Sequence, residues 1–225
     1  MRSAMIEAVS EVLVPQLARL ARWCSAATMA VIAALALAGL VLIGQGLWIH
    51  AKAVLAQILL ERAFAQTLAT STPVKPWSWA DTWPVARVAV PRIGKSAIVL
   101  AGSSGQALAF GPGQVERTPE AGEEGTAIYS AHRDTHFAFL KDVRVGDDIT
   151  VTRRDGKTFR FRVVRTSVVR FDQSGIDLMA AGRRLVLVTC WPLDARTSGP
   201  LRYLVHAELI DDATLSGRPR EGGDP

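Results

Sequence analysis

The chain has 225 residues, of which 49% are hydrophobic and 21% charged, with a formal net charge of +5 at pH 7. This length accommodates one ordinary globular domain and an extra segment. The basic residues alternate with apolar ones, as in "KTFRFRVVR", which is typical of a solvated strand face rather than of a nucleic-acid or anionic-lipid surface. We therefore expect no nucleic-acid partner.

An uncharged apolar segment lies near the N-terminus. Residues 26–49 contain no Asp, Glu, Lys or Arg, and a helix of this length, rising about 1.5 Å per residue, crosses the roughly 30 Å hydrocarbon core of a bilayer. A cleaved signal peptide is the alternative, because Ala51–Ala53 has the small-x-small pattern of a cleavage site. Since the apolar core of a signal peptide has only about 7–15 residues, we predict a transmembrane anchor at 26–49 with the lipid bilayer as its partner.

The charges that flank this segment bear on its orientation. Arg19 and Arg22 precede it and Lys52 and Arg62 follow it, so the count of positive charges is close to a tie. A single N-terminal span ahead of a folded domain usually exports that domain. We expect residues 1–25 in the cytoplasm, a single-pass location in the inner membrane, and a periplasmic or otherwise extracytoplasmic domain.

The two cysteines of the chain then lie on opposite sides of the membrane. Cys24 is at the cytoplasmic edge of the span and Cys190 is far along the exported part. A disulfide between them within one chain is excluded by this topology. Cys190 is therefore predicted to be a free thiol in a compartment that oxidises thiols, which calls for a function.

Residues 50–83 are predicted to form a helical and Trp/Pro-rich linker. Apolar residues recur at helical spacing over 51–70: Val54, Ile58, Leu59, Phe64 and Leu68. The stretch "STPVKPWSWADTWP" that follows breaks the helix at its prolines. Its three tryptophans favour packing onto the domain over carbohydrate binding.

Short strands and turns fill residues 84–211. Strand-like stretches occur at 85–91, 96–102, 108–114, 126–132, 147–170, 183–190 and 201–209. The fifth stretch contains two strands, because Asp155–Gly156 is a hairpin turn signal between two alternating runs. Eight strands with little helix predict a closed or nearly closed antiparallel barrel. Residues 212–225 are predicted to be a disordered tail.

Three reactive side chains stand at strand ends. Cys190 closes the strand 183–190, His132 closes 126–132, and Arg202 opens 201–209. A thiol attacks as thiolate and needs a base or a cation beside it, so these residues fit a nucleophile, an acid/base and a charge stabiliser. The alternative is a buried structural cysteine with a surface histidine, and spacing alone leaves both interpretations open.

Other polar residues are given lesser roles. His206 shares a strand face with Arg202 and is not expected to be catalytic, and His136 and Asp134 are expected to be solvated rather than to orient His132. His132 and His136 are the only closely spaced pair of metal-ligand type, and the acidic stretch 120–125 is the only hint of calcium. We therefore expect no metal and no cofactor.

The order of the motifs is similar to that of the sortases, a family of membrane-anchored cysteine transpeptidases. The resemblance rests on "YSAHRD", "LVLVTC" and "LRYLVHAEL" and runs from about Trp83 to Leu209. The stretches "KPWSWADTWPVARV" and "TCWP" further resemble the Gram-negative, marine proteobacterial type. Two positions depart from the family pattern, because Val186 stands where a Thr is usual and Ala131 where a Gly is often found.

The resemblance implies a mainly β fold, a sortase-like eight-stranded β-barrel with an N-terminal transmembrane helix. It implies that Cys190 attacks a peptide carbonyl in the C-terminal sorting signal of an exported protein and forms a thioester. An amine acceptor, on peptidoglycan or on a protein, would resolve that thioester. His132 would be the general acid/base, and Arg202 would bind the substrate backbone or the developing oxyanion.

Two alternative functions stay open from the sequence. If water resolves the thioester, the protein is a cysteine peptidase that releases its substrate by hydrolysis. If Cys190 is inert, the protein is a membrane-tethered β-barrel binding module without catalysis. The reactivity of the thiol in the folded protein distinguishes the second alternative from both enzymes.

Overall fold

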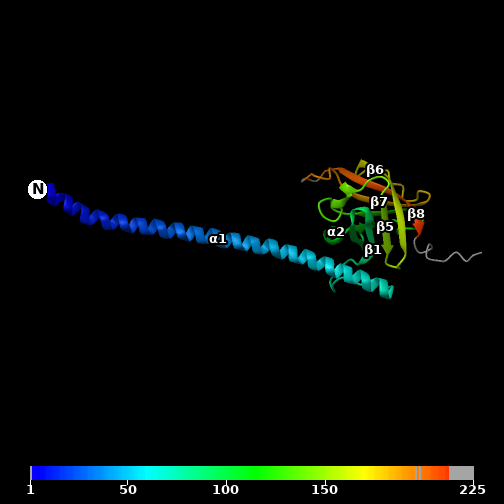
Figure 1. Ribbon diagram of the computed structural model, residues 1–225, viewed down its shortest axis with the longest axis horizontal. Coiled ribbons are helices and arrows are strands. Elements are labelled where there is room, and N and C mark those ends of the chain that lie inside the picture. The colour runs from blue at the N-terminus through cyan, green and yellow to red at the C-terminus, as the bar shows by residue number, and fades with distance from the viewer. Residues whose placement is uncertain (1, 196, 198, 213–225) are drawn as a thin grey trace, which may run out of the picture. The chain divides into compact units, whose positions relative to one another are not determined.

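The computed structural model describes residues 2–195, 197 and 199–212. Its helices and strands, in chain order, are α1 (Arg2–Thr70), β1 (Pro84–Val90), η1 (Pro91–Ile93), β2 (Lys95–Ala101), α2 (Gly105–Phe110), β3 (Gly113–Gln114), β4 (Gly125–Ser130), η2 (Ala138–Asp142), β5 (Asp148–Arg153), β6 (Thr158–Arg170), β7 (Arg183–Cys190) and β8 (Leu201–Asp212) (Figure 1). The predicted disordered tail, 212–225, lies outside the described residues except for residue 212, which ends β8.

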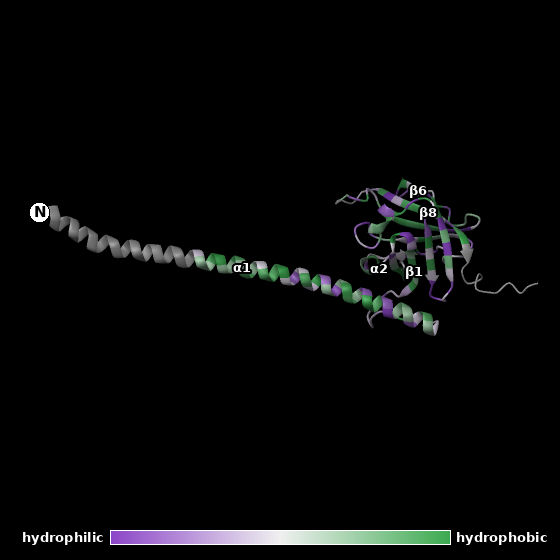
Figure 2. Ribbon diagram, in the orientation of Figure 1, coloured by the Kyte–Doolittle hydropathy of each residue, from purple (hydrophilic) through white to green (hydrophobic). Residues whose placement is uncertain are grey.

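The chain divides into two compact units, and α1 runs through the boundary between Val54 and Leu55. In the first unit the apolar side chains described from Thr28 onward are exposed. Figure 2 shows the same part of α1 coloured mostly as hydrophobic. The stretch Thr28–Thr70 is long and apolar enough to cross a membrane, by length and composition. The predicted N-terminal apolar helix is thus confirmed as an element of the fold.

The last turns of α1, from Leu55 to Thr70, belong to the second unit and bury one face. The buried residues share helical spacing: Ala56, Leu60, Ala63, Phe64 and Thr67. Leu60 and Phe64 pack with Ile98 and Leu100 of β2. The helix predicted over 51–70 is present; of the apolar residues that indicated it, Phe64 is buried, whereas Val54, Ile58 and Leu68 are exposed.

The segment between α1 and β1 also lies on the barrel. The ring of Trp77 meets that of Phe110 edge-on, with centroids 4.9 Å apart. Trp83 packs against the main core, and Thr82 Oγ1 donates a hydrogen bond to Ala101 O at 2.8 Å. Packing is therefore confirmed for two of the three tryptophans, while Trp79 is exposed.

The eight strands close into a barrel in the order β1-β2-β3-β4-β7-β8-β6-β5. This confirms the predicted eight-stranded fold. The prediction of a wholly antiparallel barrel is wrong, because β2 pairs with β3 and β4 pairs with β7 in parallel. Parallel neighbours need a crossover connection, and the period-2 pattern of a strand does not report the direction of its partner.

One predicted strand is only partly a strand. Residues 108–110 of the predicted stretch 108–114 belong to α2, and β3 is limited to Gly113–Gln114. Ser104 explains the difference, because its Oγ accepts a hydrogen bond from the Ala107 N–H and caps the helix. The short apolar run was therefore a helical turn before a brief strand.

The core fills the inside of the barrel with large apolar side chains. Fully buried examples are Tyr129, Phe137, Phe161, Leu140, Ile149, Leu185 and Leu187.

The predicted hairpin between β5 and β6 is confirmed, because Arg153 N–H bonds to Lys157 O at 2.8 Å and Gly156 has a φ of 80°. The barrel is thus a closed scaffold on which β4, β7 and β8 lie side by side.

Candidate active site

Cys190 and Arg202 are direct partners in the β7–β8 ladder. Cys190 is the last residue of β7, and Arg202 is the second residue of β8. Both are half-buried, and on the inner face their neighbours are Thr189, which is buried, and Tyr203, which packs against the main core. Opposite residues on one face of an antiparallel pair have Cβ atoms about 4.5–5.5 Å apart. The thiol and the guanidinium therefore share the outer face of the barrel at one end of the sheet.

His132 continues the parallel β4–β7 ladder at the same end. The ladder ends with Ser130 opposite Val188, and the Ala131 N–H then donates to Val188 O at 3.1 Å. Thr189 Oγ1 donates in turn to Ala131 O at 2.8 Å. His132 follows Ser130 by two residues, and Cys190 follows Val188 by two residues. The two therefore stand level just past the last pair of the ladder. Its side chain is exposed.

The guanidinium of Arg202 is held by its own loop. Its Nη1 donates to Gly199 O at 2.8 Å and to Leu201 O at 2.9 Å. Its Cζ lies 5.7 Å from the ring centroid of Phe171, within the range of a cation–π contact. Because arginine stays protonated at any working pH, this arrangement keeps a fixed positive charge next to the end of β7.

The loop after Cys190 is held by Arg133. This arginine is buried, and its guanidinium donates to Pro192 O at 3.0 Å and to Thr197 O. A buried charge is tolerated when it is hydrogen-bonded. These hydrogen bonds tie Arg133, the residue directly after His132, to the loop between β7 and β8. Trp191 in that loop stacks on Tyr203, with ring centroids 5.6 Å apart. Sequence reasoning missed Arg133, although it stands within the "YSAHRD" motif.

A second apolar cluster lies on the outer face of the same strands. Ile128, Val186 and Leu204 are buried there, although they point away from the main core. Ile176 and Leu178 of the connection 171–182 pack against them. The signal in the sequence was the unbroken apolar run "LVLV" before Thr189 and Cys190, since a strand with one solvated face alternates instead.

Two further histidines belong to the second unit, His136 and His206. His136 is half-buried, and burial lowers its pKa, although it also bonds to the Ala109 backbone. His206 shares the outer face with Arg202 but pairs with Val186, four positions along β7 from Cys190. Burial and the charge of Arg165 lower the pKa of His206 to about 4.

The acidic stretch 120–125 is occupied by interactions within the chain. Glu120 pairs with Arg153 at 2.8 Å and with Arg154 at 3.0 Å. Glu124 accepts the Gly182 N–H at 2.6 Å. Among the residues whose side chains the structure describes, 28–195, 197 and 199–210, no three His, Cys, Asp or Glu side chains are grouped to hold a metal ion. His132 and His136 are likewise in no such group.

Comparison with known proteins identifies the family. Residues 88–210 match the family model of the sortase domain. The chain belongs to the sortase family. It is 27% identical over 122 residues to sortase D of Bacillus subtilis (strain 168), in a match that covers 54% of this sortase and 61% of the relative. The match thus spans less than two thirds of that relative's length.

Solved sortase structures share the fold. Sortase C1 of Streptococcus agalactiae has a TM-score of 0.52 at 26% identity, over 70% of this chain and 87% of that one. A Clostridium perfringens sortase D5 transpeptidase has a TM-score of 0.56 at 20% identity, over 70% of this chain and 99% of that one.

Proposed function

We propose that this sortase is a cysteine transpeptidase in which Cys190 is the nucleophile, His132 the general acid/base and Arg202 the stabiliser of the oxyanion. The observation that carries the proposal is the register of three neighbouring strands. Cys190 is directly opposite Arg202 on one side, and on the other side it stands level with His132, two residues past the last β4–β7 pair. The three groups therefore flank one position for a scissile carbonyl.

In the first half-reaction the thiol proton of Cys190 passes to the imidazole of His132, and the sulfur attacks the carbonyl carbon of a peptide bond. The negative charge that develops on the carbonyl oxygen is stabilised by the guanidinium of Arg202. The C–N bond then breaks, and the imidazolium gives its proton to the leaving amine. The product of this step is a thioester between Cys190 and the acyl segment.

In the second half-reaction an acceptor amine replaces the one that left. His132 takes a proton from this amine as its nitrogen attacks the thioester carbonyl, and the C–S bond breaks. The thiolate of Cys190 recovers the proton from His132, and a new amide bond has formed. Because His132 is exposed, water can take the place of the amine, and the same steps then give hydrolysis.

The acyl segment of the substrate is proposed to lie along the outer face of β4, β7 and β8. This face carries the apolar cluster of Ile128, Val186 and Leu204 beside Cys190. Because these three residues are buried, the apolar surface open to a substrate is that of the half-buried residues packed on them, Val188, Ile176 and Leu178. Apolar substrate side chains gain free energy by packing there, at about 25 cal/mol per Å² of buried surface. We propose that the substrate is an exported protein with a C-terminal sorting signal and that the acceptor is an amine of peptidoglycan or of another protein.

We further propose that residues 26–49 anchor the sortase in the inner membrane, with the barrel of residues 84–211 in the periplasm and residues 1–25 in the cytoplasm. The uncharged apolar helix supports the anchor. The Trp/Pro-rich stretch before β1 and the "TCWP" sequence, which resemble the Gram-negative, marine proteobacterial type, support an inner-membrane location. The two cysteines report the topology, because a membrane-impermeant maleimide should label Cys190 but not Cys24 in intact spheroplasts. Labelling of Cys24 alone would contradict this orientation.

The proposed reaction is tested by the fate of the acyl segment. The full chain in detergent micelles is incubated with a randomised, terminally blocked decapeptide library, with and without a biotinylated diamine, and the products are sequenced by mass spectrometry. We expect acyl segments joined to the diamine at the expense of hydrolysis. Products independent of the diamine would indicate a peptidase, and unmodified peptides together with a thiol that reacts only after denaturation would indicate a binding module.

A further inference from the structure

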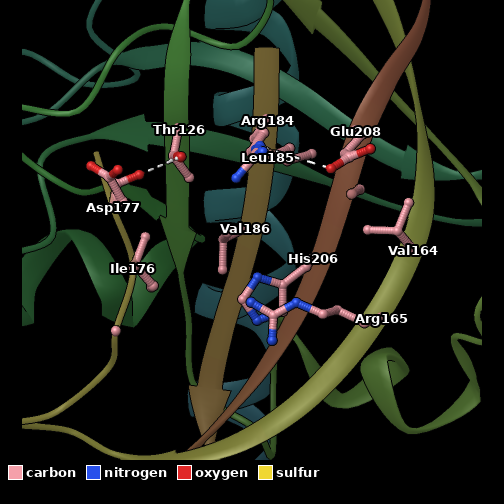
Figure 3. Close-up of a pocket in the computed structure, with 12 residues that line it drawn as sticks. Thr126, Val164, Arg165, Ile176, Asp177, Arg184, Leu185, Val186, His206 and Glu208 are labelled. Atoms are coloured by element: carbon pink, nitrogen blue, oxygen red, sulfur yellow. Dashed lines mark hydrogen bonds and ion pairs between the residues drawn. The ribbon is translucent and has the colours of Figure 1, made fainter. Parts of the chain in front are cut away.

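A small pocket lies on the outer face of the barrel at a distance from Cys190. It has a volume of about 120 Å³ and is lined by residues of β4, β6, β7, β8 and the connection 171–182. The side chains that matter here are Arg165, Asp177, Arg184, Val186, His206 and Glu208 (Figure 3). The proposed mechanism gives none of the charged ones a task.

The charges of this pocket do not balance locally. Arg184 Nε lies 3.8 Å from a carboxylate oxygen of Glu208. The carboxylate of Asp177 accepts the Met179 N–H at 3.0 Å. Among the residues that the structure describes, neither Arg165 nor Asp177 has an oppositely charged group within ion-pair distance, so the pocket holds one unmatched positive charge, on Arg165, and one unmatched negative charge, on Asp177.

A β-bulge directs Arg165 toward His206. The β6–β8 register shifts between Val163 and Arg165, so that Val164 is left without a partner and Arg165 stands opposite His206. A bulge of this kind turns a side chain away from the direction that regular pairing would give it. The guanidinium lies beside the imidazole in Figure 3, and Ser167 Oγ holds His206 Nε2 at 2.9 Å.

The imidazole of His206 is uncharged at neutral pH, because burial and Arg165 lower its pKa to about 4. An uncharged imidazole beside a guanidinium adds a hydrogen-bonding group without adding repulsion. An anion bound between them would meet one full positive charge and a polar ring. The pocket is too small for a large ligand but holds a single side-chain carboxylate.

The pocket and the proposed nucleophile, Cys190, lie at different positions along the outer face of β7. His206 pairs with Val186, four residues before Cys190, which corresponds to about 13 Å at the rise of a strand. An extended peptide covers about 3.3–3.6 Å per residue. A substrate whose carbonyl lies at Cys190 therefore reaches the pocket with a residue at least four positions away. Its path crosses the half-buried Val188 and the connection 171–182, which covers the outer apolar cluster.

We propose that Arg165 and His206 form a subsite for an acidic side chain, Asp or Glu, four to six residues before the scissile bond of the substrate. This subsite rests on the proposed function, because the role of Cys190 as nucleophile fixes the position of the scissile bond. The acyl segment stays bound through both half-reactions, whereas the amine side leaves and is replaced. A fixed subsite beside the strand therefore serves the acyl segment.

The diamine products of the randomised library test this subsite directly. Their sequences are read back from the point of transfer. At one of the positions four to six, we expect Asp and Glu to be enriched over Asn and Gln by about threefold to tenfold, as for a partly exposed, charge-assisted contact. Arg165→Gln should remove this enrichment, and Arg165→Glu should replace it with an enrichment of Lys and Arg.

Arg162→Gln is the matched control. Arg162 is an exposed arginine on the same strand, and its Nε is bonded to Asp148. This variant should keep the acidic preference of the unaltered protein. Equal recovery of acidic and amide residues by the unaltered protein, or an acidic preference that survives Arg165→Gln, would overturn the subsite.

A binding measurement separates failure of the subsite from failure of the proposed function. In the Cys190→Ala variant of the full chain, the imidazole resonance of His206 is followed by NMR during titration with a blocked pentapeptide that carries one Glu. We expect it to shift with this peptide, much less with the Gln version, and not in the double variant with Arg165→Gln. An unmoved resonance would count against the subsite even if transfer occurs. A library without diamine products would refute the transferase instead, and this titration alone would then decide the subsite.

Discussion

Strand β7 presents two apolar faces that differ in what they contact. Its inward residues Leu185 and Leu187 are fully buried in the closed core. Its outward residue Val186 is buried in a small cluster on which Ile176 and Leu178 of the connection 171–182 pack, and the next outward residues, Val188 and Cys190, are half-buried. The cover of the outward face therefore decreases toward the end of the strand, where the thiol lies.

This contrast separates stability from chemistry on one strand. An inward substitution removes packing that the closed barrel cannot replace, so it should lower stability and leave the chemistry of the folded molecules intact. An outward substitution near the end of β7 should do the reverse. Variants of neighbouring residues on β7 and β8 test whether the two faces are as independent as their surroundings indicate.

The largest effect is expected at the outward end of the strand. Cys190→Ala should lower acyl transfer at least about 10⁴-fold, because it removes the group that forms the covalent intermediate. Its midpoint of thermal unfolding should stay close to that of the unaltered protein, since the thiol is only half-buried. Transfer is measured by product mass spectrometry. Cys24→Ala is the control and should keep full activity; residual transfer by Cys190→Ala above about 1% would contradict the assignment.

The opposite position on β8 should give the next effect. Arg202→Gln should lower kcat about 10²–10³-fold, as expected for the loss of a group that stabilises an oxyanion. Steady-state kinetics with a substrate selected from the library measure it. Arg170→Gln serves as the control and should change kcat little. Arg170 is an exposed arginine at the end of β6, and it is bonded to Asp172. An equal loss of kcat in both variants would mean that Arg202 contributes only through the overall charge of the protein.

The inward face should determine stability. Leu187→Ala should lower the free energy of unfolding by about 2–5 kcal/mol, since Leu187 is fully buried. Val188→Ala, one residue away on the other face, should cost less than about 1.5 kcal/mol and raise KM instead. Chemical denaturation of the full chain in micelles measures the first quantity. A larger loss of stability for Val188→Ala would show that the outward face belongs to the core.

The smallest effect concerns pH. The pKa of His206 is lowered to about 4, whereas an unfolded histidine titrates near 6.5. Between these values the unfolded chain binds a proton that the folded chain refuses, so stability falls as the pH drops from about 6.5 to 4. His206→Gln should reduce this fall by on the order of 1 kcal/mol, allowing for partial exposure.

The comparison is made on unfolding curves at several pH values. The charged groups around His206 are Arg165, Arg184, Asp177 and Glu208, two cations and two anions that remain in the variant. Ser167→Ala, which removes the hydrogen bond to the ring, should leave the slope in place. An unchanged slope in His206→Gln would mean that this imidazole is not the group that titrates.

Much of the barrel could be predicted from the sequence because local patterns carry the information. The alternating runs around Asp155–Gly156 identified a hairpin, and the strands that end at Cys190 and begin at Leu201 were placed by their apolar runs. Strand partners were not predictable in the same way. The parallel pairing of β4 with β7, which brings His132 level with Cys190, depends on a crossover through two other strands.

The outer face was also beyond sequence reasoning in its details. The stretch that contains Val163, Val164 and Arg165 reads as a regular strand, and only the three-dimensional register reveals the bulge that brings Arg165 opposite His206. Arg133 reads as one more surface charge, although its guanidinium is buried against the backbone of a loop about sixty residues away. Such contacts depend on tertiary packing rather than on local periodicity.

A covalent intermediate on Cys190 is the most direct evidence that this residue is the nucleophile. The full chain is mixed with a substrate peptide without an added amine, quenched in acid and digested, and the site of the added mass is located by mass spectrometry. We expect an added mass equal to the acyl segment, attached to the peptide that contains Cys190 and released by hydroxylamine as a thioester is. Product formation with the acyl mass on another residue, or without any acyl mass on Cys190 under single-turnover conditions, would contradict it.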